Sequence, residues 1–527
     1  MGPRARKFAR AGLWAGLIAG AALALATVVL RLAIGAPSLQ EVLSDRLLSI
    51  TPGQLFDFLL ERLRQFGKPL MFASLTVGLV PVGGAIGIAY GWTAARLRLR
   101  HAPLRQGMVL SVAVWLIASL AVVPLAGGGP FGVSVPGGAL GFSAATFIAS
   151  TVYGLVLATL HAQLAPRPQG EELASTPGSV AAVASSRRIF LKRAALWGLG
   201  LGALGSGVWA IVTRGSRIQP SHVDTRDEGV MPPEVTPNDR FYVISKNIVD
   251  PEVDASRWSL KVEGLVERPF TLAYEELKAL PSVEQYVTLE CISNPVGGEL
   301  ISNALWKGVP LGRLMERSGL KPGVKKLVFH AWDSYSDSIP VERALRPEVI
   351  VTYQMNGEPL PHKHGFPARL IAPGLYGVKN VKWLTRIEAV DHDYRGFWQE
   401  QGWSDTAEIK TTSQLIVTPE WGKVYTSPAL LGGVAFAGDR GVSRVEVSTD
   451  GGNTWHEARL KPALSPFTWV LWTKEWLPPP GEHLVVVRAA DGQGHFQSEA
   501  WRPTFPDGAE GYQKRLVIIQ ERPEQAG

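Results

Sequence analysis

The chain has 527 residues, of which 46% are hydrophobic and 19% are charged, and its formal net charge is +7. A single cysteine excludes an internal disulfide and any metal site built from cysteines alone. The basic residues gather beside apolar runs, as in membrane proteins with positively charged cytoplasmic loops, so the net charge does not indicate a nucleic-acid partner.

Five uncharged apolar runs are long enough to cross a bilayer, which takes about 20 residues. They are Gly12–Leu30, Pro69–Ala95, Gly107–Gly127, Ala139–Leu160 and Ala194–Val212. Placing each basic cluster in the cytoplasm puts the N-terminus inside and everything after Arg214 outside. Because no run has a central histidine, we expect no haem in this part. We predict a membrane region with four spans over 1–161.

The segment 38–67, between the first two runs, repeats large apolar residues at helical spacing. These residues are Leu39, Val42, Leu43, Leu47, Leu55, Phe58, Leu59 and Leu63. The spacing suits amphipathic helices that lie on the membrane surface in contact with lipid, and it suits equally well helices that pack against the spans.

The residues from Ser186 to Lys192, Ser-Arg-Arg-Ile-Phe-Leu-Lys, directly precede the fifth run. They resemble a twin-arginine export signal, and they would also serve as a plain positively charged anchor. The resemblance implies the export of an already folded domain. We predict that 162–214 holds a cytoplasmic linker, this motif and the fifth span. The remainder is then expected on the periplasmic or extracellular side of a bacterial cytoplasmic membrane.

From Phe241 onward, short strands and short helices alternate without the rhythm of βαβ units, which indicates an α+β domain. Strand patterns cover 258–264, 286–290 and 326–330, and helix patterns cover 272–280 and 310–318. The only cysteine, Cys291, follows the second of these strands at the start of a loop. A lone cysteine is more often a buried apolar residue than a ligand, so its surroundings have to decide its role.

Several motifs between about Arg240 and Ser413 resemble the molybdopterin-binding domain of the sulfite oxidase family. They are Thr-Leu-Glu-Cys-Ile-Ser-Asn at 288–294, Asp-Ser at 333–334, Ser-Ile-Pro at 338–340, Met-Asn-Gly-Glu-Pro-Leu-Pro at 355–361, His-Gly-Phe-Pro-Ala-Arg at 364–369, Pro-Gly at 373–374, Asn-Val-Lys-Trp-Leu at 380–384 and Asp-Tyr-Arg-Gly-Phe at 393–397. Each motif alone is weak, and their order and spacing make the resemblance specific.

This resemblance implies a molybdenum–molybdopterin cofactor and assigns roles to individual residues. Cys291 would bind molybdenum as a soft thiolate ligand, and Tyr394 would be a catalytic phenol near the metal. The cofactor would be bound by Tyr242, Lys246, Asp333, His364, Arg369, Asn380 and Lys382. The forked guanidinium of arginine suits the phosphate of the pterin. We predict this domain over 215–413.

Residues 414–520 repeat short strands separated by turn signals, which predicts an all-β sandwich. The pattern is similar to the immunoglobulin-like dimerisation domain that follows the molybdenum domain in the same family. The resemblance therefore implies a structural role over 414–527 and is compatible with a homodimer.

The sequence departs from the family around the substrate. Ile244 stands where sulfite oxidases have an arginine, and Pro295 and Val296 follow the cysteine loop in place of further arginines. Each charge-assisted contact contributes about 1.5–3 kcal/mol, so their loss weakens the binding of a small dianion. Lys246 or Arg395 would substitute only in part. We expect that sulfite is not the physiological substrate.

The leading hypothesis is a membrane-anchored molybdoenzyme that transfers an oxygen atom and exchanges electrons with a separate carrier or a membrane quinone. It would oxidise sulfite or a related small oxyanion, or reduce a sulfoxide or N-oxide as exported methionine-sulfoxide reductases do. A metal-free scaffold or binding protein on the same fold is a second class. An electron carrier or transporter formed by the spans is a third, which the lack of intramembrane charges disfavours.

Overall fold

The computed structural model describes residues 3–34, 36–63, 67–97, 102–135, 139–165, 229–247 and 250–521. The twin-arginine-like motif and the fifth apolar run lie outside the described residues. The described residues form two compact units. A helical unit falls within 1–48, 66–220 and 246–249, and a larger unit falls within 49–65, 221–245 and 250–527.

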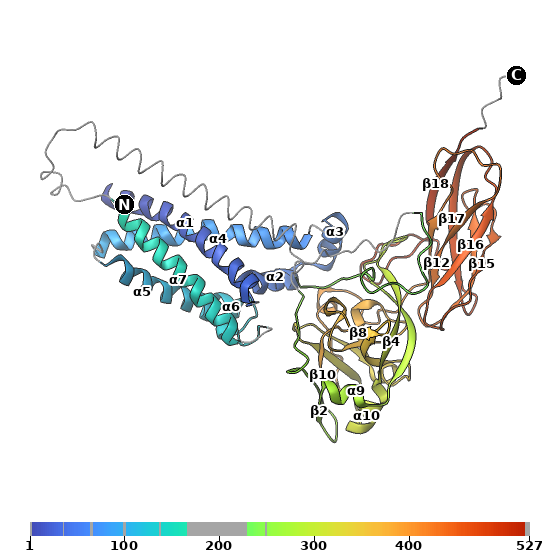
Figure 1. Ribbon diagram of the computed structural model, residues 1–527, viewed down its shortest axis with the longest axis horizontal. Helices are drawn as coiled ribbons and strands as arrows, with labels where there is room; N and C mark the ends of the chain where they lie inside the picture. Colours follow the sequence, from blue (N-terminus) through green and yellow to red (C-terminus); the bar gives the residue numbers. More distant parts are fainter. Residues whose placement is uncertain are drawn as a thin grey trace, which may run out of the picture. The chain divides into compact units, whose positions relative to one another are not determined.

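Long apolar helices make up the helical unit. They are α1 (Pro3–Ile34), α4 (Gly67–Leu97), α5 (Pro103–Ile117) with its continuations η2 (Ala118–Val122) and α6 (Val123–Leu125), and α7 (Ala139–Leu164), which run alongside one another (Figure 1). The shorter α2 (Leu39–Ile50) and η3 (Pro130–Gly132) accompany them. Within the described residues, four stretches are long and apolar enough to cross a membrane, namely Ala5–Arg31, Leu70–Leu97, Pro103–Leu125 and Ala139–Leu164. These stretches overlap the first four predicted runs.

Glycines allow α1 and α4 to approach each other closely. Gly12, Gly16 and Gly20 of α1 face Gly83 and Gly87 of α4, at a four-residue spacing on each helix. A Cβ atom added at Gly83 would lie 2.7 Å from the carbonyl oxygen of Gly16, so no larger residue fits there. Small residues at this spacing let two helices pack backbone against backbone, which is a main source of helix association in lipid.

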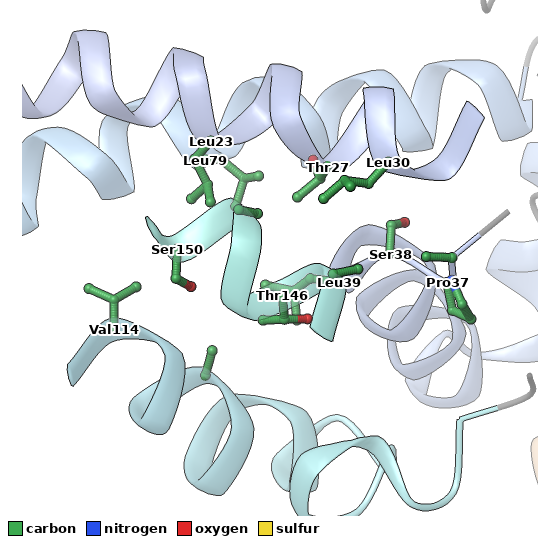
Figure 2. Close-up of a pocket in the computed structure, with 14 residues that line it drawn as sticks. Leu23, Thr27, Leu30, Pro37, Ser38, Leu39, Leu79, Val114, Thr146 and Ser150 are labelled. Atoms are coloured by element: carbon green, nitrogen blue, oxygen red, sulfur yellow. The ribbon is translucent and has the colours of Figure 1, made fainter. Parts of the chain in front are cut away.

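A small cavity of about 60 Å³ lies within the helical bundle (Figure 2). Its lining is mostly apolar, and Figure 2 shows Thr27 of α1 and Thr146 and Ser150 of α7 among the side chains around it. The volume matches about two water molecules and is far below that of a ring cofactor. The cavity is therefore a gap in helix packing rather than a cofactor site.

Two sheets build the first part of the larger unit. One has the order β2-β1-β10-β5-β6, with β1 (Ser259–Gly264), β2 (Phe270–Ala273), β5 (Lys326–Ala331), β6 (Ser336–Pro340) and β10 (Leu384–Val390). The other has the order β3-β4-β7-β8, with β3 (Val283–Glu290), β4 (Ile301–Pro310), β7 (Ile350–Met355) and β8 (Glu358–Pro359), and β9 (Arg369–Ile371) pairs with β7. The strands β1 and β10 are parallel although their residues are far apart in the sequence, with Lys261 opposite Arg386.

Short helices connect these strands. They are α9 (Tyr274–Ala279), α10 (Leu311–Ser318), α11 (Val341–Ala344), η5 (His362–His364), η6 (Gly377–Lys379) and η7 (Gln399–Gln401). The inward faces of the first sheet and of α10 share one apolar core, which includes Leu260, Phe329 and Leu314. The predicted strands and helices of this region are confirmed, with shifts of a few residues at their ends.

Two further sheets follow, with the orders β11-β12-β16-β15 and β14-β13-β17-β18. Their strands are β11 (Thr412–Val417), β12 (Ala429–Phe436), β13 (Val442–Ser448), β14 (His456–Glu457), β15 (Arg459–Leu460), β16 (Val470–Trp476), β17 (Gly481–Asp491) and β18 (Gln513–Ile519). Both sheets contribute to one core around Trp472, Val447 and Val487. The predicted β-rich domain is thus present, with every described pairing antiparallel.

The helix α3 (Gly53–Leu63) belongs to the larger unit although it lies between two apolar helices in the sequence. A Cβ atom added at Gly53 would lie 2.9 Å from the carbonyl oxygen of Gln401, so the start of α3 packs closely against the η7 turn. The side chains of Leu55, Phe58 and Leu59 are 48%, 54% and 39% exposed. One face of α3 therefore presents a contiguous set of large apolar residues.

Candidate functional site

Cys291 lies immediately after β3, where the β3–β4 pairing ends with Glu290 opposite Ile301. Its amide donates to Leu300 O at 2.9 Å, and its carbonyl accepts from Asn294 N at 3.0 Å. The Asn294 side chain holds the loop by accepting from Leu300 N at 2.9 Å. Cys291 is 8% exposed, and its Sγ lies 3.1 Å from Ser293 Oγ. The strand end and the turn thus fix the backbone of Cys291.

The phenol of Tyr242 lies beside the loop that contains η6. A Cβ atom added at Gly377 would lie 2.7 Å from Tyr242 Oη and 3.9 Å from the Cα atom of Cys291. Burial, and after it the negative charge of Cys291, raises the pKa of the Tyr242 phenol well above its usual value, so the phenol stays protonated. The structure therefore brings Tyr242, Cys291 and the η6 backbone together.

Arg369, the first residue of β9, is a buried cation. Its Nη1 donates to His364 O and its Nη2 donates to Asn380 O, both at 3.0 Å. Within the described part of the chain, its buried Nε has no hydrogen-bond partner and no carboxylate lies within ion-pair distance. Burial lowers the pKa of this guanidinium to about 10, which leaves it charged at neutral pH. A buried charge of this kind is stabilised when an anion binds beside it.

His364 is held as a neutral imidazole. Its Nε2 lies 2.8 Å from the carbonyl oxygen of Asn238, which only accepts, so Nε2 carries the proton and Nδ1 is an acceptor. Burial, and less strongly the charge of Arg369, lowers the pKa of His364 well below its usual value. The ring also contacts Phe241 edge to face at 5.3 Å between centroids.

The side chains of Asn380 and Lys382 have different hydrogen-bond partners. The Asn380 amide accepts from Ala372 N at 2.7 Å and donates to Leu375 O and Tyr376 O at 3.2 and 3.1 Å. These three bonds shape the loop, so a contact with a cofactor here would come from the backbone. Lys382 donates to Lys363 O at 3.1 Å and lies 4.2 Å from the centre of the Trp383 ring.

Asp333 and Tyr335 lie in the turn between β5 and β6. The buried Asp333 carboxylate accepts from the amide of Tyr335 at 3.1 Å, and Ser334 between them has a φ of 62°. The Tyr335 hydroxyl lies 2.8 Å from Val378 O and 3.1 Å from Asp337 Oδ2. Burial is the main cause that raises the pKa of the Tyr335 phenol, and the charges of Asp337, Asp333 and Cys291 add to it. Tyr335 thus connects the Asp333 turn to the η6 loop.

Tyr394 follows β10 and is tied to β6. Its hydroxyl lies 2.8 Å from Ser336 Oγ, and its carbonyl accepts from Ser338 Oγ at 2.9 Å and from Lys326 Nζ at 3.0 Å. The centroids of the His330 and His392 rings lie 6.2 and 6.4 Å from that of Tyr394. Ser336 and Ser338 of β6 thus position the predicted catalytic phenol.

Lys246 belongs to the helical unit. Its ammonium group is buried and lies 3.4 Å from Asp45 Oδ2 and 3.1 Å from Asn247 Oδ1. These contacts give Lys246 a carboxylate partner, unlike Arg369. The role of Lys246 in binding the cofactor stays a prediction.

Sequence reasoning missed three ionisable residues of this region, namely Tyr335, Asp337 and Lys379. Asp337 and Lys379 are 0% and 1% exposed, and Lys379 Nζ lies 2.7 Å from Asp337 Oδ1. No local sequence signal separates Asp337 and Lys379 from surface residues, because Asp337 stands between Ser336 and Ser338 and Lys379 stands between Val378 and Asn380. Such residues are almost never fully buried unless they are paired.

Two family models match the larger unit. The model described as the oxidoreductase molybdopterin-binding domain matches residues 247–398, and the Mo-co oxidoreductase dimerisation domain matches residues 409–502.

Curated relatives match the same region. The chain is 31% identical over 321 residues to the sulfite oxidase of Gallus gallus, covering 51% of this chain and 70% of that protein. It is 32% identical over 287 residues to the mitochondrial sulfite oxidase of Drosophila melanogaster, covering 45% of this chain and 50% of that protein. An uncharacterized oxidoreductase of Bacillus subtilis, YuiH, is 32% identical over 175 residues, which cover 33% of this chain and 86% of that protein. The chain thus spans about half the length of the mitochondrial relatives that it matches.

Among solved structures, the sulfane dehydrogenase SoxCD from Paracoccus pantotrophus aligns with a TM-score of 0.48 and 24% identity, covering 55% of this chain and 84% of that chain.

Proposed function

This chain belongs to the sulfite oxidase family of molybdopterin-dependent oxidoreductases, and on that premise we propose that it transfers an oxygen atom at a molybdenum ion bound by Cys291. It is a molybdenum-dependent oxidoreductase with a molybdenum–molybdopterin cofactor. When bound, this cofactor supplies a metal that exchanges two electrons and an oxygen atom with the substrate. The side chains of the protein bind it, orient it and move protons.

The observation that carries the proposal is the buried guanidinium of Arg369. It is 5% exposed, and among the described residues its Nε has no hydrogen-bond partner. A cofactor with a phosphate group supplies the missing anion, and arginine binds phosphate with a forked pair of donors. Gly377 lets the η6 backbone approach Tyr242 closely, since a Cβ atom there would lie 2.7 Å from Tyr242 Oη. The residues present therefore fit an anionic pterin.

The remaining residues take roles that follow from their donors and acceptors. Cys291 supplies one thiolate, which suits a metal whose other sulfur ligands come with the pterin. His364 presents Nδ1 as an acceptor for an N–H group of the ring system, because its Nε2 proton is used by Asn238 O. Tyr394 holds a phenolic proton that Ser336 Oγ keeps in one orientation.

The residues around Cys291 bear on whether the protein oxidises or reduces its substrate. The half-buried Ile244 and the exposed Pro295 stand where arginines would bind a dianion such as sulfite. Neutral sulfoxides and N-oxides do not need those cations. The leading proposal remains oxygen-atom transfer of the sulfite oxidase type, and the apolar Ile244 specifically favours reduction of a sulfoxide or N-oxide as the second candidate.

We further propose that the chain is anchored in a membrane with its larger unit on the outer face. The four apolar helices of the described residues supply the anchor. The apolar face of α3, formed by Leu55, Phe58 and Leu59, follows closely after one such helix and precedes another in the sequence, and contact with lipid would remove it from water. The match to a dimerisation domain over 409–502 supports a homodimer, and the two antiparallel sheets that share one core support an immunoglobulin-like sandwich.

The test is purification from membranes followed by four measurements on one sample. We expect about one molybdenum and one pterin per chain. Turnover with sulfite and a chemical electron acceptor should be low, and turnover of methionine sulfoxide with a reduced dye should be measured beside it. Molybdenum far below one atom per chain would support a metal-free scaffold instead. Sulfite turnover equal to that of a genuine sulfite oxidase would contradict the role given to Ile244.

A further inference from the structure

A chain of four ionisable side chains leads from the Cys291 region to the protein surface. The Tyr335 hydroxyl lies 3.1 Å from Asp337 Oδ2, and Asp337 Oδ1 lies 2.7 Å from Lys379 Nζ. Lys379 Nζ lies 3.0 Å from Asp405 Oδ1, and the Asp405 side chain is 37% exposed. Every link is within hydrogen-bond distance, and each member is able to gain and lose a proton.

The inner end of this chain touches the loops that we assign to the cofactor. The amide of Tyr335 donates to Asp333, and its hydroxyl lies 2.8 Å from Val378 O, the residue after Gly377. The electrostatic influence of Cys291 reaches the Tyr335 phenol. The outer end branches at Asp405, whose Oδ2 accepts from Lys326 Nζ at 2.6 Å, and Lys326 also pairs with the exposed Asp393 at 2.5 Å.

Tyr335 can form its two hydrogen bonds whether the Asp337 carboxyl group is ionised or protonated. A phenol has one proton and two lone pairs. With Asp337 ionised, the Tyr335 proton is shared between Val378 O and Asp337 Oδ2. With Asp337 neutral, the Tyr335 hydroxyl donates to Val378 O and the carboxyl group donates to the phenol oxygen. Burial raises the pKa of Asp337, and the ammonium of Lys379 acts in the opposite direction.

The proposed reaction needs such a route in either direction. Oxidation of a substrate by oxygen-atom transfer consumes one water and releases two protons and two electrons, and the electrons leave to the separate carrier. Reduction of a sulfoxide or N-oxide consumes two protons and two electrons and releases one water. Two protons therefore cross between a buried site and the solvent in each turnover.

We propose that Tyr335, Asp337, Lys379 and Asp405 form the path by which protons pass between the oxygen-transfer site and solvent. This inference rests on the proposed function, since it assigns the inner end of the path to the cofactor loops. A buried ion pair that serves only stability is the competing explanation, and replacing such pairs by apolar residues is often neutral. The two explanations differ in whether the proton on Asp337 is exchangeable and whether turnover depends on it.

The first experiment needs no molybdenum. Infrared difference spectra of the full chain across about pH 5 to pH 9, in H₂O and D₂O, report the protonated carboxyl groups. We expect one deuterium-sensitive carboxyl band that disappears in Asp337→Asn and persists in Asp491→Asn. Asp491 is a matched control because its buried carboxylate is paired with Arg440 in the β-rich domain. A spectrum with no Asp337-dependent band at any pH would overturn the proposal.

The second experiment measures turnover per molybdenum. We expect Asp337→Asn to lower kcat at least about 10-fold with unchanged KM, to flatten the pH profile and to change the solvent isotope effect. Asp337→Glu should restore part of the rate, and the milder Asp405→Asn at the exposed end should show the same trend. A fall in rate that only follows lost molybdenum or lost thermal stability would overturn the path. Because the infrared result does not depend on the cofactor, failure of the proposed function itself would be visible separately as absent molybdenum.

Discussion

Replacing Arg369 by methionine tests how the site holds its anion. In the cofactor-free protein the change removes two hydrogen bonds to buried carbonyls, those of His364 and Asn380. Each bond from a charged donor contributes about 1.5–3 kcal/mol. The change also removes a buried charge without a carboxylate partner, whose desolvation costs about several kcal/mol. These effects oppose each other, so we expect the free energy of unfolding without cofactor to change by less than about 2 kcal/mol.

With cofactor bound, the loss of the guanidinium is expected to cost more free energy than it does in the cofactor-free protein. The guanidinium then gains a charge-assisted contact with the anion worth about 1.5–3 kcal/mol, which corresponds to about 10- to 150-fold in affinity. We therefore expect Arg369→Met to lose most of its pterin during purification while it stays folded. The pterin released from a known amount of protein, measured by its fluorescence after oxidation, gives the occupancy directly.

Arg343→Met is the matched control. Arg343 is also a mostly buried arginine that donates to a backbone carbonyl, that of Pro373 at 2.5 Å, but it pairs with Asp439 at 2.9 Å. It should lose stability and keep its pterin. Equal pterin occupancy in wild type and Arg369→Met would refute the reasoning, as would equal losses in both variants.

Three further changes probe the other members of the site. Tyr394→Phe removes the hydroxyl that lies 2.8 Å from Ser336 Oγ, so turnover per molybdenum should fall by about 100-fold or more while metal content is unchanged; undiminished turnover would remove Tyr394 from the chemistry. Burial lowers the pKa of His364 in the folded chain below its usual 6.5, so the unfolded chain takes up the proton first as pH falls. The free energy of unfolding should therefore be highest above about pH 6.5 and fall below it by up to about 1.4 kcal/mol per pH unit. Denaturant titrations at about pH 7.5 and pH 5.5 measure this change. The change should be smaller in His364→Gln than in wild type. Gly377→Ala places a methyl group 2.7 Å from Tyr242 Oη, so it should displace the phenol and lower pterin occupancy, and the double variant with Tyr242→Phe should recover part of it. A single variant that keeps full occupancy would show that the position of the Tyr242 phenol does not matter for pterin binding.

The parts of the site that follow from local sequence were predictable. Cys291 sits at the end of a strand and before a turn, and both are visible as alternation followed by Pro295 and Gly297. His364 and Arg369 were assigned to the cofactor from the order of the motifs, and that assignment stays a prediction. Periodicity and residue type also predicted the five short elements between 258 and 330, although only β1 among the strands alternates in burial and β5 is buried on both faces.

The parts that depend on long-range pairing were not predictable from periodicity. The Lys379–Asp337 ion pair joins residues that meet only because the η6 loop lies against β6. The same holds for the parallel pairing of β1 with β10, which brings Lys261 opposite Arg386. Asn380 shows a different limit of prediction from sequence. The motif points to this residue, but it does not show that the side-chain amide is hydrogen-bonded to three backbone groups.

The most direct test of the central claim is the sulfur coordination of molybdenum in wild type and Cys291→Ser, measured by X-ray absorption on protein with quantified metal. If Cys291 binds the metal, the variant that still holds the pterin should show one sulfur neighbour fewer at molybdenum and should not turn over. An unchanged number of sulfur neighbours together with full activity would contradict the assignment.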